Sequence, residues 1–277
     1  SVYDGASSLA EAILMACRIK KKNKVVISQT LHPEYIETAQ TYAFGSDIKV
    51  LVSPCNCLYE TDWDKLETLI DGETAALVVS VPNFFGVIED VRRVQKITQE
   101  KDIMLIVAAN PIALAFLKPP SEYGADIVVG EGQPLGNSLN FGGPYLGFMS
   151  AKAKYLRSMP GRIVGETIDK EGNRAFVLTL QAREQHIRRE KATSNICSNE
   201  ALNALAATIY LAYLGKEGLK SVAYNCIANT QYFINEAKKY QGIRIINSKV
   251  FNEVAVEVDN LEEEYQKALN AKILPGL

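Results

Sequence analysis

Short apolar runs rich in β-branched residues recur along the first 150 residues, and segments with helical spacing of apolar positions lie between them. Such runs are typical of strands that are buried on both faces of a sheet. The predicted strands are Val25–Ser28, Ile48–Val52, Ala75–Val81, Ile103–Ala108, Ile127–Val129 and Leu146–Ser150. The predicted helices are Ala6–Lys20, Pro33–Phe44, Trp63–Ile70, Ile88–Glu100 and Lys152–Arg157. This alternation predicts an α/β domain around a mostly parallel sheet.

The pattern changes from Asn199 onward. The predicted elements are a helix at Asn199–Leu214 ending at Gly215, a long helix at Leu219–Tyr240, strands at Ile243–Ile246 and Glu253–Val258, and a helix at Leu261–Lys272. We therefore divide the chain into a large domain with its following helix, residues 1–218, and a linking helix with the start of a smaller α+β domain, residues 219–277. Because two strands and one helix are marginally stable alone, we expect this sequence to be a fragment whose C-terminal domain is incomplete.

Composition and net charge argue against some kinds of binding partner for this chain. Hydrophobic residues make up 47% of the 277 residues and charged residues 22%, which is typical of a globular protein. A net charge of −2 argues against nucleic acid or an anionic membrane as the main partner. No apolar run approaches the roughly 20 residues needed to span a bilayer, and Ser1-Val-Tyr-Asp-Gly lacks the pattern of a signal peptide. We expect a cytoplasmic protein.

The five cysteines do not indicate a disulfide framework, because their number is odd and Cys55 and Cys57 are too close in sequence for an ordinary bridge. Cys55 and Cys57 with His32 could suggest a metal site, but no second pair of ligands completes the set of four. We expect reduced thiols and no metal.

The segment from Leu178 to Leu202 concentrates polar chemistry. It carries six charged side chains and one of the two histidines within nine residues, and Thr193, Ser194 and Asn195 follow at once. An alanine-rich helical pattern starts after Ser198. One interpretation is an anion site where a loop meets a helix N-terminus, since free N–H groups favour anions there. The other is a salt-bridged surface segment with an ordinary helix cap.

Further polar motifs follow or precede predicted elements. Tyr3–Glu11 places a turn and two serines at the start of a helix, which favours either a phosphate site or a simple Asp or Ser cap. Asn83-Phe-Phe-Gly86 directly follows a strand, where open α/β sheets form their ligand crevice. Gly130–Gly136 follows another strand, and Phe141–Pro144 marks tight turns before the next. Glycine-rich loops alone indicate little about function.

Together these runs resemble the P-protein of the glycine cleavage system, glycine dehydrogenase (decarboxylating). The match is to its N-terminal half, which in two-subunit bacterial enzymes is a separate chain, subunit 1. The runs that carry the resemblance are Tyr3–Ala12, Pro82–Asp90, Pro119–Gly136, Phe141–Phe148, Met159–Thr167 and, most specifically, Phe176–Leu202. The resemblance implies the aspartate-aminotransferase-like fold of pyridoxal-phosphate (PLP) enzymes, transferase fold type I.

That fold implies a Schiff-base lysine, an aspartate at the pyridine nitrogen and a phosphate site. The lysine belongs in the loop after Ile127–Val129, yet none occurs between Lys118 and Lys152. Asn110 stands where the carboxylate is expected, and a neutral amide cannot offset a pyridinium charge. The resemblance also makes His32, after the strand Val25–Ser28, a relic of the ring-stacking position, although a helix-start histidine fits equally. His32, Asn83 and Asn110 are thus the predicted vestigial cofactor-site residues, and no catalytic residue is predicted on this chain.

The resemblance therefore implies a subunit that does not carry PLP and acts with subunit 2, which does. The pair would decarboxylate glycine and pass the aminomethyl group to the lipoyl arm of the H-protein, in an α2β2 assembly. We predict that Thr193, Ser194 and Asn195 reach the partner's PLP site, with Arg188, Arg189 or Lys191 adding positive potential. The alternatives are an independent PLP-dependent lyase or aminotransferase, which the missing lysine disfavours, and a catalytically empty paralogue with an interaction or regulatory role.

Overall fold

The computed structural model describes residues 1–179, 185–192 and 194–276. A six-stranded sheet occupies its centre, in the order β2-β1-β3-β4-β5-β6. The first five strands are parallel, and β6 pairs antiparallel with β5. The strands are β1 (Lys24–Ser28), β2 (Lys49–Ser53), β3 (Thr74–Val81), β4 (Met104–Ala109), β5 (Ile127–Glu131) and β6 (Gly147–Ala151). The predicted α/β architecture with a mostly parallel sheet is confirmed.

Alternating residues of the strands pack against helices on the two faces of the sheet. Val25 and Ile27 of β1 belong to the core with α1 and α2, whereas Val26 belongs to the core with α3 and α4. The helices are α1 (Gly5–Lys20), α2 (Pro33–Phe44), α3 (Trp63–Thr68) and α4 (Val91–Glu100). Because both faces are covered, the central strands are apolar at nearly every position rather than at every second one.

Two predicted helices differ in detail from the structure. The segment predicted as a helix at Ile88–Glu100 starts later, as α4 at Val91, because the side chain of Asp90 accepts a hydrogen bond from the Arg92 N–H. The segment after β6 forms a 3₁₀ helix, η3 (Ala153–Ser158), instead of an α-helix. Further 3₁₀ turns are η1 (Ala113–Ala115) and η2 (Pro120–Tyr123).

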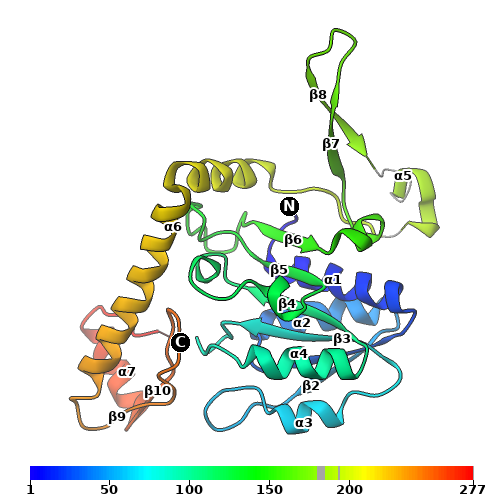
Figure 1. Cartoon of the computed structure of the whole chain (residues 1–277). Helices are drawn as coiled ribbons and strands as arrows, with labels where there is room; N and C mark the ends of the chain where they lie inside the picture. The colour runs from blue at the N-terminus through cyan, green and yellow to red at the C-terminus, as the bar shows by residue number, and fades with distance from the viewer. Residues whose placement is uncertain (180–184, 193, 277) are drawn as a thin grey trace.

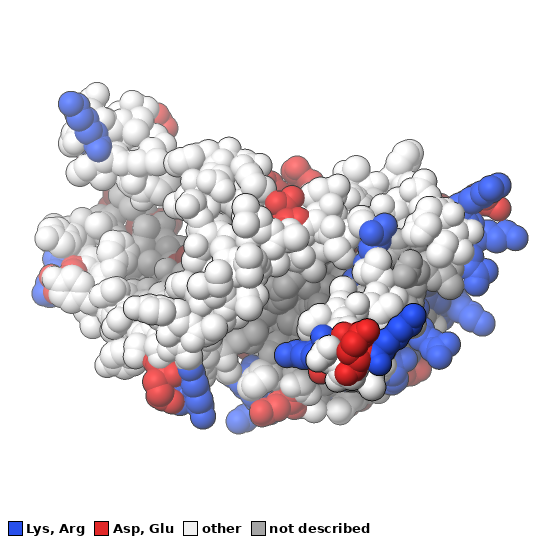
Figure 2. All heavy atoms as spheres, turned by 90° about the horizontal axis from the view of Figure 1, so that it is seen from above, with Lys and Arg blue, Asp and Glu red and all other residues white. Residues whose placement is uncertain are grey.

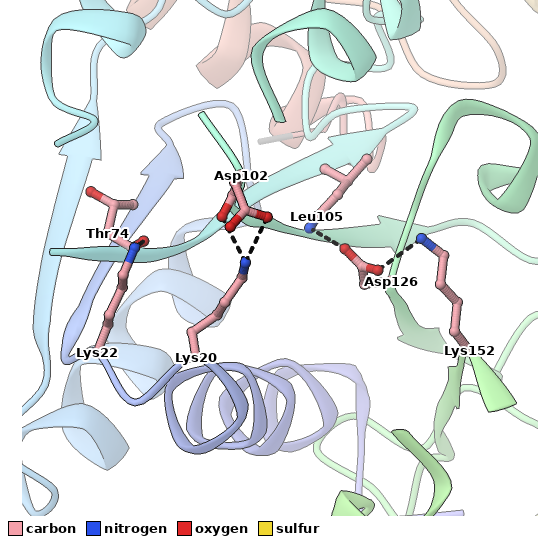
Figure 3. Close-up of polar contacts among 7 residues, drawn as sticks. All are labelled: Lys20, Lys22, Thr74, Asp102, Leu105, Asp126 and Lys152. Atoms are coloured by element: carbon pink, nitrogen blue, oxygen red, sulfur yellow. Dashed lines mark hydrogen bonds and ion pairs between the residues drawn. The ribbon is translucent and has the colours of Figure 1, made fainter. Parts of the chain in front are cut away.

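Polar contacts hold the amino ends of the strands (Figure 3). The Lys20 ammonium donates to the Asp102 carboxylate at 3.0 Å and to the Asp102 carbonyl at 2.7 Å. Asp126 accepts from the Leu105 N–H at 3.1 Å and pairs with Lys152 at 2.8 Å. Asp102 is almost fully exposed, so its ion pair contributes little to stability.

After β6 the chain leaves the sheet as an antiparallel hairpin that the sequence pattern did not predict. Strands β7 (Ile163–Ile168) and β8 (Arg174–Thr179) pair across a turn containing Gly172, which adopts a φ of 85°. Figure 1 shows the hairpin projecting away from the body of the molecule. Most of its residues are exposed on both faces, although an isolated hairpin is marginally stable in water.

The long helix α6 (Ala201–Ala237) joins this region to the C-terminal elements. It is interrupted at Gly215, whose φ of 59° and ψ of −169° are not helical, and its two parts run in different directions in Figure 1. The break lies where the predicted helices were divided, so that prediction is confirmed. The chain continues through β9 (Ile243–Ile245), β10 (Val256–Val258) and α7 (Leu261–Asn270), in which β9 and β10 pair antiparallel.

Candidate functional site

The first turn of α1 is capped within the chain. Asp4 is the N-cap, and its Oδ1 accepts hydrogen bonds from the Ser7 N–H at 2.7 Å and from the Ser7 hydroxyl at 2.8 Å. The Ser8 hydroxyl donates to the Phe148 carbonyl of β6 at 2.6 Å. Of the two interpretations of this motif, the Asp cap is the one observed, and both serine hydroxyls are used inside the protein.

Glu131, at the end of β5, reaches the same turn. Its Oε2 accepts from the Gly5 N–H at 3.0 Å, and its Oε1 accepts from Gln133 N–H and Leu146 N–H, both at 2.9 Å. Burial raises the pKa of the carboxyl group, and the three backbone donors act in the opposite direction. The sequence showed only that a lysine was missing from this loop; it did not reveal what Glu131 does.

Asn83 lies in a closed polar network after β3. Its amide donates to Glu89 Oε1 and to the Tyr59 carbonyl, both at 2.9 Å, and its Oδ1 accepts from the backbone of its own loop. Glu89 also accepts from the hydroxyls of Thr30 and Thr61 at 3.1 and 2.8 Å. Burial raises the pKa of Glu89. Asn83 is 3% exposed, so its groups are committed to this network rather than presented to a ligand.

Asn110 and His32 each serve the local backbone. Asn110 Oδ1 accepts from the N–H groups of Ile112 and Ala113 at 2.9 and 3.2 Å, just before the 3₁₀ turn η1. His32 is the N-cap of α2, and its Nδ1 accepts from the Glu34 N–H at 3.2 Å. The exposed His32 ring lies edge-on to Phe84 at 4.8 Å between centroids. These contacts agree with the interpretation of His32 as a residue that starts a helix.

The polar corner is the sequence Thr193-Ser194-Asn195, which follows the charged segment. Of these residues, Ser194 contacts α1. The Ser194 hydroxyl donates to Glu11 Oε1 at 2.7 Å and accepts from the Ile196 N–H at 3.0 Å. Glu11 is buried, and this burial raises its pKa. Asn195 is exposed, and Thr193 lies outside the described residues. The sequence offered no signal for the Ser194–Glu11 contact, because 183 residues separate the two.

This corner does not start the long helix. Helix α6 begins at Ala201 after Glu200, which is in the left-handed region and makes no side-chain cap. The interpretation that placed a polar site at this helix N-terminus therefore differs from the structure. The described charged residues form short exposed turns, α5 (Gln185–Arg188) and η5 (Arg189–Lys191), while residues 180–184 lie outside the described part.

The part of the chain that the structure describes contains neither a candidate metal site nor a candidate membrane span. Across residues 1–179, 185–192 and 194–276, no group of three or more His, Cys, Asp or Glu side chains could hold a metal ion. Cys17, Cys55, Cys57, Cys197 and Cys226 are free. Within that same part of the chain, no helix has the length and hydropathy to cross a membrane.

Comparison with known proteins identifies relatives over the whole chain. The family model described as glycine cleavage system P-protein matches residues 1–274. A protein of Carboxydothermus hydrogenoformans described as probable glycine dehydrogenase (decarboxylating) subunit 1 is 52% identical over 276 residues. That alignment covers 100% of this chain and 62% of the relative. The chain therefore spans less than two thirds of the length of this relative.

Solved structures extend the comparison to the fold. A crystal structure of glycine decarboxylase (P-protein) of the glycine cleavage system, in inhibitor-bound form, superposes with a TM-score of 0.92 at 40% identity, covering 98% of this chain and 61% of that chain. A cysteine desulfurase of Escherichia coli gives a TM-score of 0.68 at 15% identity, covering 98% and 65%. The second likeness shows the fold alone, that of PLP-dependent transferases of fold type I, as the sequence resemblance predicted.

Proposed function

The chain belongs to the glycine cleavage system P-protein family, and from that membership we propose that it is part of subunit 1 of a two-subunit glycine decarboxylase. The complete subunit acts with subunit 2 to decarboxylate glycine and to pass the aminomethyl group to the lipoyl arm of the H-protein. Subunit 2 carries the PLP. The assembly is α2β2, and this chain is the partner without a Schiff-base lysine.

The residues at the carboxyl edge of the sheet do not fit a PLP held by this chain, and this observation carries the proposal. PLP supplies an electron sink, and it needs a lysine, a pyridine partner and an anion site. No lysine occurs between Lys118 and Lys152. The Asn110 side-chain oxygen is committed to two backbone N–H groups, and the Gly5 N–H is committed to Glu131.

An exposed apolar surface supports the presence of a partner chain. Leu202, Leu205, Ile209 and Tyr213 are 55–89% exposed, and their spacing places them on one stripe of α6. Figure 2, seen from above, shows a broad region without Lys, Arg, Asp or Glu over the first part of α6, whereas charged side chains gather at the tip of the hairpin. Large apolar stripes of this kind are typical of protein–protein interfaces. We assign this surface to subunit 2.

The polar corner is the part of this chain that we propose to reach the partner's PLP site. Ser194 is held by Glu11 of α1, which gives the corner a fixed base on the large domain. The exposed Asn195 side chain is presented to the outside, and Thr193 is included from the sequence. Arg188, Arg189 and Lys191 add positive potential nearby in the chain.

Reconstitution tests the proposed activity. The full-length chain is copurified with subunit 2, and glycine–bicarbonate carboxyl exchange is measured with H-protein. We expect exchange only when both subunits are present. A stable complex whose exchange equals that of subunit 2 alone would contradict the proposal and favour a regulatory, catalytically empty paralogue.

A double substitution tests the role of the corner. Thr193→Ala plus Asn195→Ala in the reconstituted complex should weaken PLP affinity and slow exchange, because contacts to the partner's cofactor are lost. The matched control is Asn270→Ala, an exposed asparagine at the end of α7. Unchanged PLP affinity and turnover in the double variant would remove the corner from the site.

A further inference from the structure

Three separate segments converge on the carboxylate of Glu131. The donors are the Gly5 N–H at the start of α1, the Gln133 N–H in the loop after β5, and the Leu146 N–H just before β6, at 3.0, 2.9 and 2.9 Å. No lysine or arginine takes part in these three bonds. The negative charge is therefore held by backbone dipoles, as a phosphate is held at a helix N-terminus.

The helix end that Glu131 contacts is suited to an anion. The first N–H groups of an α-helix have no partner within the helix, and the macrodipole places partial positive charge there. In α1 the Gly5 N–H is taken by Glu131 and the Ser7 N–H by Asp4. Two carboxylates of the chain thus occupy the first turn of α1.

While the Glu131 side chain is in place, a second anion cannot bond to the Gly5 N–H. Gly5 is buried, and a Cβ atom built on it would collide with the hydroxyl of Tyr35 from α2. An oxyanion bonded to the Gly5 N–H would have to occupy the position of Glu131 Oε2. The two cannot be present together.

We propose that the Glu131 carboxylate is the chain's built-in substitute for a cofactor phosphate at the N-terminus of α1. It neutralises the helix end, ties α1 to β5 and β6, and excludes phosphate esters from this chain. Removing the side chain leaves three oriented N–H donors around a space, so the site then takes an inorganic oxyanion. This inference concerns one chain by itself and does not depend on the proposed activity with subunit 2.

The test is anion rescue of Glu131→Ala in the full-length subunit, followed by thermal unfolding without partner, glycine or PLP. The matched control is Glu89→Ala, which removes another buried carboxylate whose donors are mostly side-chain hydroxyls and an amide, and none is an N–H within the first turn of a helix. We expect both variants to lose about 5 °C or more in unfolding midpoint. Inorganic phosphate or acetate, at constant ionic strength with chloride, should restore about 3 °C to Glu131→Ala and less than about 1 °C to the wild type and to Glu89→Ala.

Two outcomes would overturn the inference: no anion-specific gain in Glu131→Ala, or an equal gain in Glu89→Ala. If Glu131→Ala is recovered unfolded, its refolding yield is measured against phosphate concentration. A yield that does not depend on phosphate would also overturn the inference. Glu131→Gln adds a second comparison. Its amide fills the space and places a donor against an N–H, so it should be destabilised without responding to phosphate.

Discussion

Two regions of this molecule differ in whether their side chains have partners within the chain. At the carboxyl edge of the sheet, Asn83, Glu89, Asn110 and Glu131 each form side-chain hydrogen bonds within the chain. On the other side, the β7–β8 hairpin and the first part of α6 leave apolar side chains exposed, among them Phe176 and Tyr213 at 62% and 89%.

The difference bears on which surface of this chain is available for binding. In an open α/β sheet the carboxyl edge is the usual ligand crevice, and here the four polar side chains named above are hydrogen-bonded within the chain. The surface that remains unsatisfied lies outside that crevice, where a second chain can cover it. Under the proposed function, this chain uses the fold to support contacts with subunit 2 rather than to hold a cofactor.

The largest expected effect is on the free energy of unfolding, which should depend much more on the sheet core than on the exposed hairpin. Leu105 of β4 is fully buried, so Leu105→Ala should lower the free energy of unfolding by about 3 kcal/mol through the cavity it leaves. Phe176→Ala on the exposed hairpin should change it by less than about 1 kcal/mol. Urea unfolding of each full-length variant measures both. Similar losses at the two positions would show that the hairpin is as much a part of the folded core as β4.

Binding to subunit 2 should instead depend most on side chains of the exposed region. Ile209→Asp places a charge in the exposed stripe of α6 and should raise the dissociation constant about 100-fold. Thr208→Asp adds the same charge at an exposed position about 100° around the helix and should have a much smaller effect. Titration calorimetry with subunit 2 measures both constants. Equal effects would place the interface elsewhere.

The closed network should also give a pH signature. Burial raises the pKa of Glu89 above its ordinary value of 4.5, so the folded protein retains a proton that the unfolded chain releases. The stabilisation from this proton is complete below about pH 4.5 and is lost as pH rises through the raised pKa of the folded state.

Glu89→Gln removes this titration. As pH rises through that window, the wild type should lose stability relative to Glu89→Gln, by at most about 1.4 kcal/mol per pH unit. Urea unfolding of both proteins from pH 4 upward provides the measurement. A difference that stays constant with pH would show that Glu89 titrates alike in the folded and unfolded states.

The smallest effect concerns the cap of α1. Asp4→Ala removes the acceptor for the Ser7 N–H and should cost about 1 kcal/mol of unfolding free energy. Asp4→Asn keeps an acceptor at the same position and should retain most of that stability. Thermal unfolding distinguishes the two. An Asp4→Ala protein as stable as the wild type would mean that Glu131 alone satisfies this helix end.

The predictions that succeeded depend on local patterns. Five parallel strands and the helices between them follow from apolar runs and capping residues, and the break in α6 follows from Gly215. The hairpin was missed because the strands Ile163–Ile168 and Arg174–Thr179 have no buried face and therefore no alternation to detect. Its turn at Asp169–Asn173, with Gly172 at positive φ, was the available signal.

The site residues illustrate what a linear pattern cannot contain. Glu131 contacts Gly5 across 126 residues, and Ser194 contacts Glu11 across 183. Neither partner has a chemical reason to be paired until the fold brings them together. The missing lysine could be read from the chain, but the carboxylate that closes the α1 helix end could be found only in three dimensions.

The most direct test of the central claim is the absorbance spectrum after PLP is added to the full-length chain alone, to subunit 2 alone and to the purified complex. The account predicts no Schiff-base band from this chain, and a band from the complex whose PLP affinity falls with Thr193→Ala plus Asn195→Ala. A Schiff-base band from this chain by itself would contradict it.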